Sequence, residues 1–428
     1  MKKVREGYKI TEFGEIPEEW NISKLSEITE LITKGATPMT YGFDFEDEGI
    51  NFIKVENIME SGKIDKNSLL KISEECNNKL SRSKIQKGDI LMSIAGTLGR
   101  TAIISEEVIP ANTNQALAII RLKKINNVDY INKTLSSSYI KKHINMIGTV
   151  GAQPNLSLKQ IGDFNILLPS IKEQEKIASI LSTVDEQIDN VDALIEKNKE
   201  LKKGLMQTLL TKGIGHTKFK KTEIGEIPEE WQVKRLGNVC EVKSSKRVYQ
   251  SDYIDSGVPF YRSKEIIELS KGNLPTVELF IARDKFEEFK EKYGVPKLGD
   301  LMITSVGSVG KTWVCDGREF YYKDGNLTQI ISNNEINTKY ISYVFECEYL
   351  IKQYLGQSSG SAQVALTLEK LKNLLVIFPT IKEQEKIASI LSEVDKKIEE
   401  YENKKQKLEE LKKGLMQQLL TGMIRVIV

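Results

Sequence analysis

IKEQEKIASILS, residues 171–182, recurs letter for letter as residues 381–392, and this repeat decides the fold of the chain. The offset of 210 residues (381 minus 171) indicates two copies of a whole domain, because solenoid units span only about 20–50 residues. Two more pairs match: LKKGLMQTLLT at 201–211 with LKKGLMQQLLT at 411–421, and GEIPEEW at both 14–20 and 225–231. Between these matches the halves differ strongly. Identical scaffolds with different inserts predict one architecture that recognises two different things.

Each copy of the repeated segment predicts a long helix. Apolar residues follow one another at spacings of four and three, which is typical of a coiled-coil seam. Ser170 and Thr380 each stand three residues before a glutamate, the spacing of a capping box at a helix start. About 40 residues at a rise of about 1.5 Å give a rod of about 60 Å. The helix-pairing positions are Ile177, Leu181, Val184, Ile188, Val191 and Ile195, then Ile387, Leu391, Val394, Ile398 and Tyr401.

A helix with so narrow an apolar seam needs a partner, and the obvious partner is its own repeat. Because a whole domain separates the copies, the two helices can pair as an antiparallel coiled coil with internal pseudo-two-fold symmetry. The alternative is that each helix packs only on its neighbouring globular domain. Asn198 and Lys405 interrupt the seam, where they either set the register or are exposed.

The segments between the helices are mixed α/β in both halves. Short strand-like runs bounded by glycine are followed by a helical stretch, near residues 129–147 and 338–355, and by an apolar strand that ends in proline. The predicted organisation is an α/β domain at 1–170, a helix at 171–212, a second α/β domain at 213–380, and a helix with a C-terminal tail at 381–428.

Composition excludes several classes of protein. The 428 residues include 62 basic and 60 acidic side chains, so any nucleic-acid surface must be a local patch. The four cysteines form no CxxC pair, which fits a reduced cytosolic protein and disfavours a zinc site. No apolar run is long enough for a bilayer, and the N-terminus lacks an apolar signal-peptide core. The cytoplasm is therefore the expected location, without a membrane partner.

Groups suited to catalysis are scarce. The histidines are His143 and His216, and neither recurs in the other half. Two unmatched histidines make a metal site or a histidine-based catalytic centre hard to build. We therefore predict no catalytic residue and no metal ligand on this chain.

Residues 305–312, SVGSVGKT, imitate a phosphate-binding loop. The first glycine of that motif is Ser305, the matching loop has Arg100 in place of the lysine, and strand-like residues follow where a helix is required. A tight hairpin with Arg100 or Lys311 at its tip explains the glycines better. The basic tip either contacts a DNA phosphate or is a solvated turn charge. An enzyme using this loop would lose nucleotide binding in Lys311→Ala.

Three polar loops occupy matching places in both halves but differ in their residues. They mix basic, hydroxyl, amide and tyrosine side chains, the groups that contact phosphates and base edges. Any one loop fits ordinary loop composition, whereas the set points to recognition. The DNA-binding candidates, hairpin tips included, are Lys34, Thr37, Tyr41, Lys54, Asn57, Arg100, Asn112, Asn114, Gln115, Lys243, Ser245, Lys246, Arg247, Tyr249, Arg262, Lys264, Lys311, Asn326 and Gln329.

At this point the chain resembles a known family. The motif P-x-x-x-E-Q-x-x-I-A-x-I-L at the start of each helix, and GEIPEEW followed by Leu25 or Leu236, look like the specificity subunit of type I restriction-modification enzymes. The resemblance covers essentially the whole chain. It implies two α/β (α+β) target-recognition domains in tandem, each followed by a long spacer helix.

The resemblance also implies a function and partners. Each recognition domain would read one half of a bipartite, asymmetric site in double-stranded DNA, and the helices would dock two methyltransferase subunits. Motor-nuclease subunits would join for cleavage, and S-adenosylmethionine, ATP and Mg²⁺ would bind those partners, leaving this chain non-catalytic. The alternative is a coiled-coil adaptor whose α/β inserts bind proteins. Phosphate contacts predict a DNA affinity that falls steeply as the salt concentration rises. The adaptor hypothesis predicts no salt-dependent DNA affinity.

Overall fold

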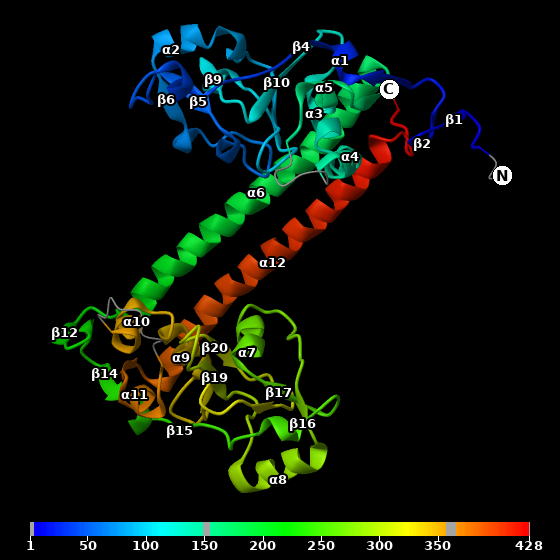
Figure 1. The fold of residues 1–428 in the computed structure, drawn as a ribbon. Helices are drawn as coiled ribbons and strands as arrows, with labels where there is room; N and C mark the ends of the chain where they lie inside the picture. Colours follow the sequence, from blue (N-terminus) through cyan, green and yellow to red (C-terminus); the bar gives the residue numbers. More distant parts are fainter. Residues whose placement is uncertain (1–3, 149–154, 357–364, 428) are drawn as a thin grey trace. The chain divides into compact units, whose positions relative to one another are not determined.

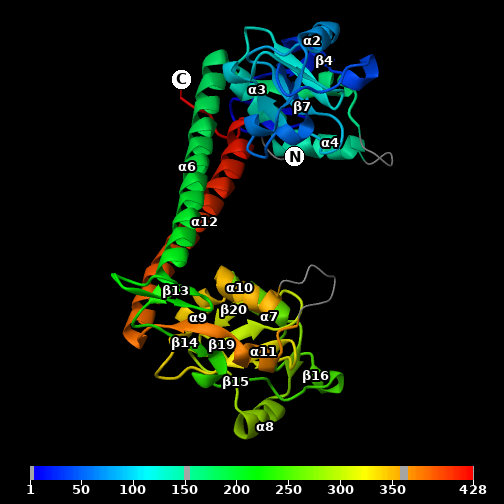
Figure 2. The same cartoon turned by 90° about the vertical axis from the view of Figure 1, so that its left-hand side faces the viewer.

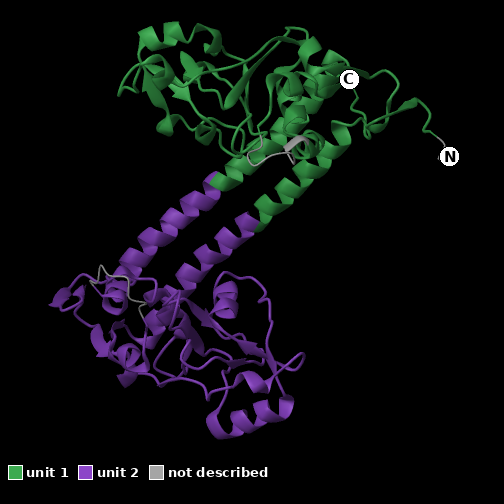
Figure 3. Ribbon diagram, in the orientation of Figure 1, with its two compact units in different colours: residues 1–192, 403–428 green, residues 193–402 purple. Residues whose placement is uncertain are grey.

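The computed structural model describes residues 4–148, 155–356 and 365–427 (Figure 1). The chain divides into two compact units, of which unit 1 comprises residues 1–192 and 403–428 and unit 2 comprises residues 193–402 (Figure 3). Each unit therefore combines one α/β domain with part of each long helix.

Two sheets form the α/β domain of unit 1. Their strands are β4 Thr29–Lys34, β5 Ile50–Ile53, β6 Leu70–Ile72, β7 Ile90–Ser93, β8 Thr101–Ile103, β9 Ala111–Thr113 and β10 Leu117–Leu122. One sheet is antiparallel with the order β4-β10-β7-β8, and the other has the order β6-β5-β9 with β5 parallel to β9. Strand β10 is apolar on both faces because Ile120 packs toward the helices while Ile119 packs toward the second sheet.

Short helices cover this domain. They are α1 Leu25–Ile28, α2 Glu74–Lys79, α3 Val128–Leu135, α4 Ser138–Gly148 and α5 Leu158–Gly162. The single helical stretch predicted near residues 129–147 is therefore two helices, because the chain turns at Ser136 and Ser137. The Ser137 hydroxyl accepts a hydrogen bond from the Ile140 amide and so begins α4.

Unit 2 repeats this topology with one additional strand, β16, in its second sheet. Its strands are β15 Val242–Lys243, β16 Tyr253–Ile254, β17 Val258–Tyr261, β18 Phe280–Ile281, β19 Leu301–Thr304, β20 Thr312–Val314, β21 Tyr321–Tyr322 and β22 Leu327–Ile330. The sheet orders are β15-β22-β19-β20 and β16-β18-β17-β21, and β17 runs parallel to β21. The helices are α7 Ser263–Ser270, α8 Arg283–Tyr293, α9 Thr338–Val344, α10 Glu348–Leu355 and α11 Leu368–Asn373. The prediction that the dissimilar inserts share a fold is confirmed.

Small strand pairs connect each domain to its long helix. In unit 1 the hairpin β1 (Tyr8–Thr11) and β2 (Gly14–Pro17) precedes β3 (Asn21–Lys24), which pairs with β11 (Asn165–Leu168). The equivalents in unit 2 are the hairpin β12 Phe219–Thr222 with β13 Gly225–Pro228, and the pair β14 Gln232–Arg235 with β23 Leu375–Phe378. Strands β11 and β23 lead through proline directly into the long helices.

The long helices are α6 (Ile171–Leu209) and α12 (Ile381–Leu419), which lie side by side in both units (Figures 1 and 2). They run antiparallel. In unit 1, Asp185 pairs with Lys412 at 2.6 Å and Asp192 pairs with Lys405 at 2.7 Å. The residue numbers of the partners in α12 therefore fall as those in α6 rise. Lys405, predicted to interrupt the seam, is thus an ion-pair partner, while the half-buried Asn198 donates from its side chain to the Leu194 carbonyl.

Most residues of the predicted seam are buried, but some of them pack against an α/β domain as well as against the other helix. Ile177 and Leu181 are fully buried, but they join the core of the adjacent domain together with Leu419, the last residue of α12, and Leu420, which follows it. Each helix start therefore packs on its own α/β domain and on the partner helix at once. Val184, Val191, Ile195, Ile387, Leu391 and Val394 are also buried, and Ile188, Ile398 and Tyr401 are half-buried.

Candidate nucleic-acid interface

The repeated motif residues hold each domain on its helix. The indole of Trp20 in GEIPEEW donates a hydrogen bond to the Glu173 carboxylate at 3.1 Å, and Trp231 donates to Glu383 at 2.9 Å. Both tryptophans are buried. The Glu173 amide donates a hydrogen bond to the Ser170 hydroxyl, as the capping-box spacing predicts. The Glu173 carboxylate, however, accepts from Trp20.

The glutamine of the motif fixes a second element. Gln174 donates to the Pro169 carbonyl at 3.0 Å and accepts from the Asn127 amide at 3.1 Å, just before α3. Gln384 makes the same two contacts in unit 2, with Pro379 and Asn337. Because these buried amides have matched partners, the frame under each domain is the same.

The two glycine-rich loops are hairpins, as the sequence predicts. β7 pairs with β8, and β19 with β20, both antiparallel. The Ser93 hydroxyl closes the first hairpin by accepting from the Arg100 amide at 2.8 Å, and Thr304 does the same for Lys311 at 2.9 Å. Gly99 has a φ of +78° and faces Ile144, so a side chain there would clash. The Arg100 guanidinium bonds to the Ile58 carbonyl at 3.2 Å, whereas Lys311 is exposed.

In unit 1 several candidates meet where the parallel strands β5 and β9 end. Lys54 follows β5, and Asn114 and Gln115 follow β9. The segment after β4 lies against them, because Gly35 has its amide bonded to the Asn114 carbonyl and Thr37 donates to Gln115 at 2.7 Å. The strand-end surface of unit 1 comprises Lys34, Thr37, Tyr41, Lys54, Asn114 and Gln115.

Unit 2 assembles its candidates at the same edge, where β17 and β21 end. Ser245 donates to the Tyr322 carbonyl at 2.7 Å, and Arg247 pairs with Asp324 at 2.8 Å. Arg262 directly follows β17 and so lies beside the end of β21. The strand-end surface of unit 2 comprises Lys243, Ser245, Lys246, Arg247, Tyr249, Arg262, Lys264 and Asn326. The carboxyl ends of parallel strands are a common place for ligands.

One residue of this surface was not found from the sequence. Tyr293, at the end of α8, is 46% exposed, its carbonyl accepts from Lys243 at 3.2 Å, and its ring faces the Lys246 ammonium. Tyrosine beside two lysines is suited to contact both a base and a phosphate. Tyr293 lies about 50 positions from the loop that it contacts, and no local pattern links the two.

Equivalent positions after β5 and β17 carry different chemistry. The Lys54 amide donates to the side chain of Asn57, and the Arg262 amide donates to the side chain of Glu265, both at 2.7 Å. Asn57 is neutral and buried, whereas Glu265 is a fully buried carboxylate that also binds the Arg262 guanidinium at 2.8 Å. The first domain therefore offers the point charge of an ammonium group, which lies over the Phe45 ring, and the second offers a planar guanidinium held by a buried carboxylate.

Burial places three other candidates beneath the surface. Asn57, Asn112 and Gln329 have at most 2% exposure and bond within their own domains. Asn112 bonds to Asn77 at 2.9 Å, and Gln329 bonds to Asp300 at 2.6 Å. These side chains support the loops and do not reach a ligand in this conformation, so direct DNA contact stays a prediction for the candidates that are exposed or half-buried.

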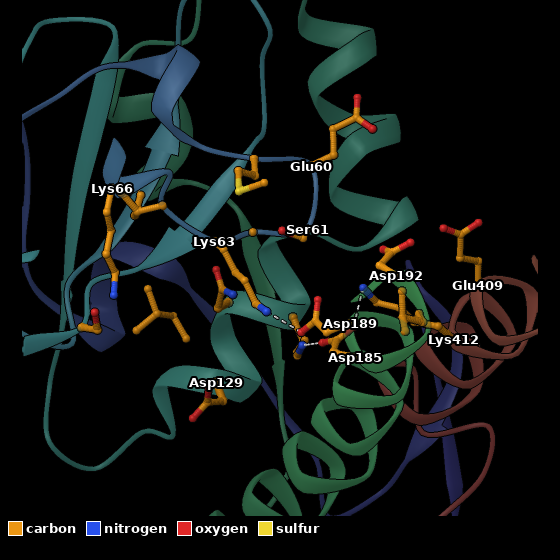
Figure 4. A pocket seen from close by; sticks show the side chains of 18 of the residues that line it. Glu60, Ser61, Lys63, Lys66, Asp129, Asp185, Asp189, Asp192, Glu409 and Lys412 are labelled. Atoms are coloured by element: carbon orange, nitrogen blue, oxygen red, sulfur yellow. Dashed lines mark hydrogen bonds and ion pairs between the residues drawn. The ribbon is translucent and has the colours of Figure 1, made fainter. Parts of the chain in front are cut away.

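A cleft of about 930 Å³ lies in unit 1 between the domain and the long helices (Figure 4). Lysines and carboxylates alternate along its walls. Lys63 pairs with Asp189 at 2.5 Å, and Asp185 pairs with both Lys133 and Lys412. Because nearly every charged side chain in the cleft forms an ion pair, we interpret the cleft as a structural contact between the domain and the long helices. Within the described residues, no group of histidine, cysteine and carboxylate side chains suits a metal ion.

The sequence profile of the type I restriction modification DNA specificity domain matches residues 17–201 and again residues 228–410. The chain belongs to the type I restriction-modification specificity-subunit family. The two matches include most of each α/β domain and most of each long helix. None of the helices described is long and apolar enough to cross a membrane.

Relatives of this family match along the entire chain. A Methanocaldococcus jannaschii protein provisionally named the type I restriction enzyme MjaX specificity subunit is 30% identical over 437 residues, covering 98% of this chain and 97% of the relative. The MjaVIII specificity subunit of the same organism is 27% identical over 447 residues and covers 100% and 99%.

Solved structures share the fold. A chain from a study of assembly and conformational transition of the type I R-M system has a TM-score of 0.58 at 18% identity, covering 96% of this chain and 99% of that one. The S subunit of the type I restriction-modification system from M. genitalium has a TM-score of 0.56 at 16% identity, covering 97% of both chains.

Proposed function

We propose that this specificity subunit reads a bipartite, asymmetric target in double-stranded DNA, one half-site with each α/β domain. The observation that carries the proposal is a repeated frame beneath unlike surfaces. The Trp–Glu and glutamine contacts recur in both units, while the strand-end surfaces differ at almost every side chain. Because different side chains fit different base edges, the two half-sites should differ in sequence.

The partners follow from the family. We propose that two methyltransferase subunits dock on the paired helices, where Leu194, Leu201 and Leu411 are exposed apolar side chains. Motor-nuclease subunits would join this complex for cleavage. S-adenosylmethionine, ATP and Mg²⁺ would bind those partners, and this chain would supply no catalytic group. The names of the relatives as type I restriction enzyme subunits support this assignment.

Selection from randomised duplex DNA tests the proposal, using the chain together with the methyltransferase that copurifies with it. We expect a bipartite, asymmetric motif with a fixed gap, and an affinity that falls steeply as salt rises because phosphates release counterions on binding. Recovery of unselected sequence without salt-dependent affinity would favour the coiled-coil adaptor.

Paired substitutions assign the half-sites. Lys34→Ala changes the surface of unit 1 and Lys246→Ala that of unit 2, and both lysines are exposed. Each variant should alter one half of the selected motif and leave the other intact. A change in both halves by either variant would contradict one domain for each half-site.

A further inference from the structure

We infer that Glu278 is a built-in competitor of DNA, occupying the anion position of Arg262 and Lys264 until a DNA phosphate displaces it. The inference rests on the proposed function and assigns a role to a residue that the sequence did not single out. It concerns specificity, because a competitor of this kind weakens binding to every sequence that offers phosphates alone.

The geometry of the cluster carries the inference. The Arg262 guanidinium donates to the Glu278 carboxylate at 2.9 Å, and the Lys264 ammonium donates to the other carboxylate oxygen at 2.5 Å. One carboxylate thus answers two cations with its two oxygens, as a phosphate would. Glu278 is 52% exposed and lies next to β18, outside the core, so displacing it breaks no packing.

A second carboxylate makes the arrangement directional. Glu265 is fully buried and holds the Arg262 guanidinium from the inner side, together with the Arg262 amide. Because Glu265 cannot leave, Arg262 keeps its orientation when Glu278 swings away. The guanidinium is then ready for an incoming anion with little loss of side-chain entropy.

The charge of Glu278 is secure. Hydrogen bonds from Lys264 and then Arg262 lower its pKa to about 2, so the carboxylate is ionised at any physiological pH. A comparable contact is present in unit 1, where Arg100 lies 3.7 Å from Glu60, which is 91% exposed. In both units a candidate cation therefore faces an exposed, displaceable acid.

Direct DNA contact by Glu278 is the competing explanation, because a carboxylate can accept a hydrogen bond from cytosine N4. The two explanations predict opposite results. A competitor lowers affinity for all DNA, so its removal strengthens binding. A reading carboxylate raises affinity for one base, so its removal weakens binding to the target.

The test is Glu278→Gln in the full chain with its copurified methyltransferase, measured on a labelled duplex of scrambled sequence across a salt series. We expect about three- to tenfold tighter binding to this non-target duplex, as expected for two exposed ion pairs. The salt dependence should also steepen, because no freed carboxylate takes up a cation on binding. Glu278→Asp, which keeps the charge, should stay close to wild type.

Glu319→Gln is the matched control. Glu319 is 51% exposed and pairs with Arg283 at 2.8 Å, but it precedes β21 and so lies at the opposite edge of the sheet. An equal gain in this variant would reduce the effect to net charge and overturn the inference. Loss of one base from the selected motif in Glu278→Gln would overturn it in favour of direct contact. If the wild-type chain binds no DNA at any salt concentration, both the proposed function and this inference fail.

Discussion

At the scale of single residues, the glutamate of the repeated motif connects three parts of each unit. Glu173 accepts from Trp20 and also from Arg425 at 2.7 and 3.0 Å, so the segment after α12 closes onto the start of α6. In unit 2 the segment after α6 supplies His216, which lies 2.8 Å from Glu383. The same carboxylate thus joins the GEIPEEW segment, a helix start and a helix exit.

Glu173→Gln should destabilise unit 1 selectively. The variant leaves the Arg425 guanidinium facing a neutral amide at a buried position, which costs about 1–3 kcal/mol of unfolding free energy. Hydrogen exchange measured on peptides from each unit should show faster exchange in unit 1 and unchanged exchange in unit 2. Glu383→Gln is the reciprocal control. Equal loss of protection in both units after one substitution would contradict this assignment.

The sequence could predict these motif residues but not their partners. Ser170 and Glu173 have the spacing of a capping box, and that local rule correctly begins the helix. The carboxylate itself bonds to Trp20, which lies 153 positions away, and such a contact leaves no periodic signal. Tyr293 was missed for the same reason. The buried amides at 57, 112 and 329 look like any loop amide until the fold encloses them.

At the scale of elements, each long helix has one aspartate that contacts both the other long helix and the adjacent α/β domain. In unit 1 Asp185 pairs with Lys412 of α12 and with Lys133 of α3. In unit 2 Asp395 pairs with Lys202 of α6 at 2.9 Å and accepts from the Tyr343 hydroxyl at 2.6 Å. Unit 1 therefore places two lysines on one carboxylate where unit 2 places only one.

This difference predicts that stability rises with pH at this lysine of unit 1, because the pKa of Lys133 is lowered whereas that of Lys202 in unit 2 is raised. Burial, and then the charge of Lys412, lowers the pKa of Lys133 to about 8 from its ordinary value of 10.5. The unfolded chain therefore takes up this proton at a higher pH than the folded chain. By linkage, the contribution of Lys133 to stability falls as the pH drops from about 10.5 to about 8, and it is constant below that window.

Lys133→Met removes this titration. The difference in unfolding free energy between variant and wild type should change between pH 8 and pH 10.5 and level off below pH 8. Denaturant unfolding at a series of pH values, followed by exchange in unit 1, measures it. Parallel curves for the two proteins would show that Lys133 titrates normally.

Element types were easier to predict than element ends. The long helices begin at Ile171 and Ile381 as the motif predicts, because the prolines before them stop the preceding strands. The helical stretch before each of them breaks into two helices, and only in unit 1 does a serine pair mark the break. In unit 2 the break falls at Phe345–Cys347, where tertiary packing decides and no turn residue stands.

At the scale of the whole molecule, the repeat accounts for the division into two units that share both long helices. Residues 171–192 of α6 belong to unit 1 and residues 193–209 belong to unit 2, while α12 divides at 402 and 403. The proposed bipartite target requires a defined spacing between the two domains that recognise its half-sites. We therefore expect the length of the paired helices to set the gap between the half-sites.

Insertion of one heptad into both helices tests this expectation. Placed after Asp192 in α6 and before Asn403 in α12, the insertions keep the seam in register, because the pairing there is antiparallel. Seven residues add about 10 Å of helix. At about 3.4 Å for each base pair, the gap should lengthen by about three base pairs.

Selection from randomised DNA measures that gap, with both half-sites serving as internal references. They should keep their sequences, because neither strand-end surface includes a residue of the long helices. The control is a variant in which seven existing residues beside each insertion point are replaced by the inserted sequence. This variant changes the composition of the helices but not their length, and it should keep the wild-type gap. An unchanged gap after the double insertion, with both half-sites still selected, would mean that contacts outside the helices set the spacing.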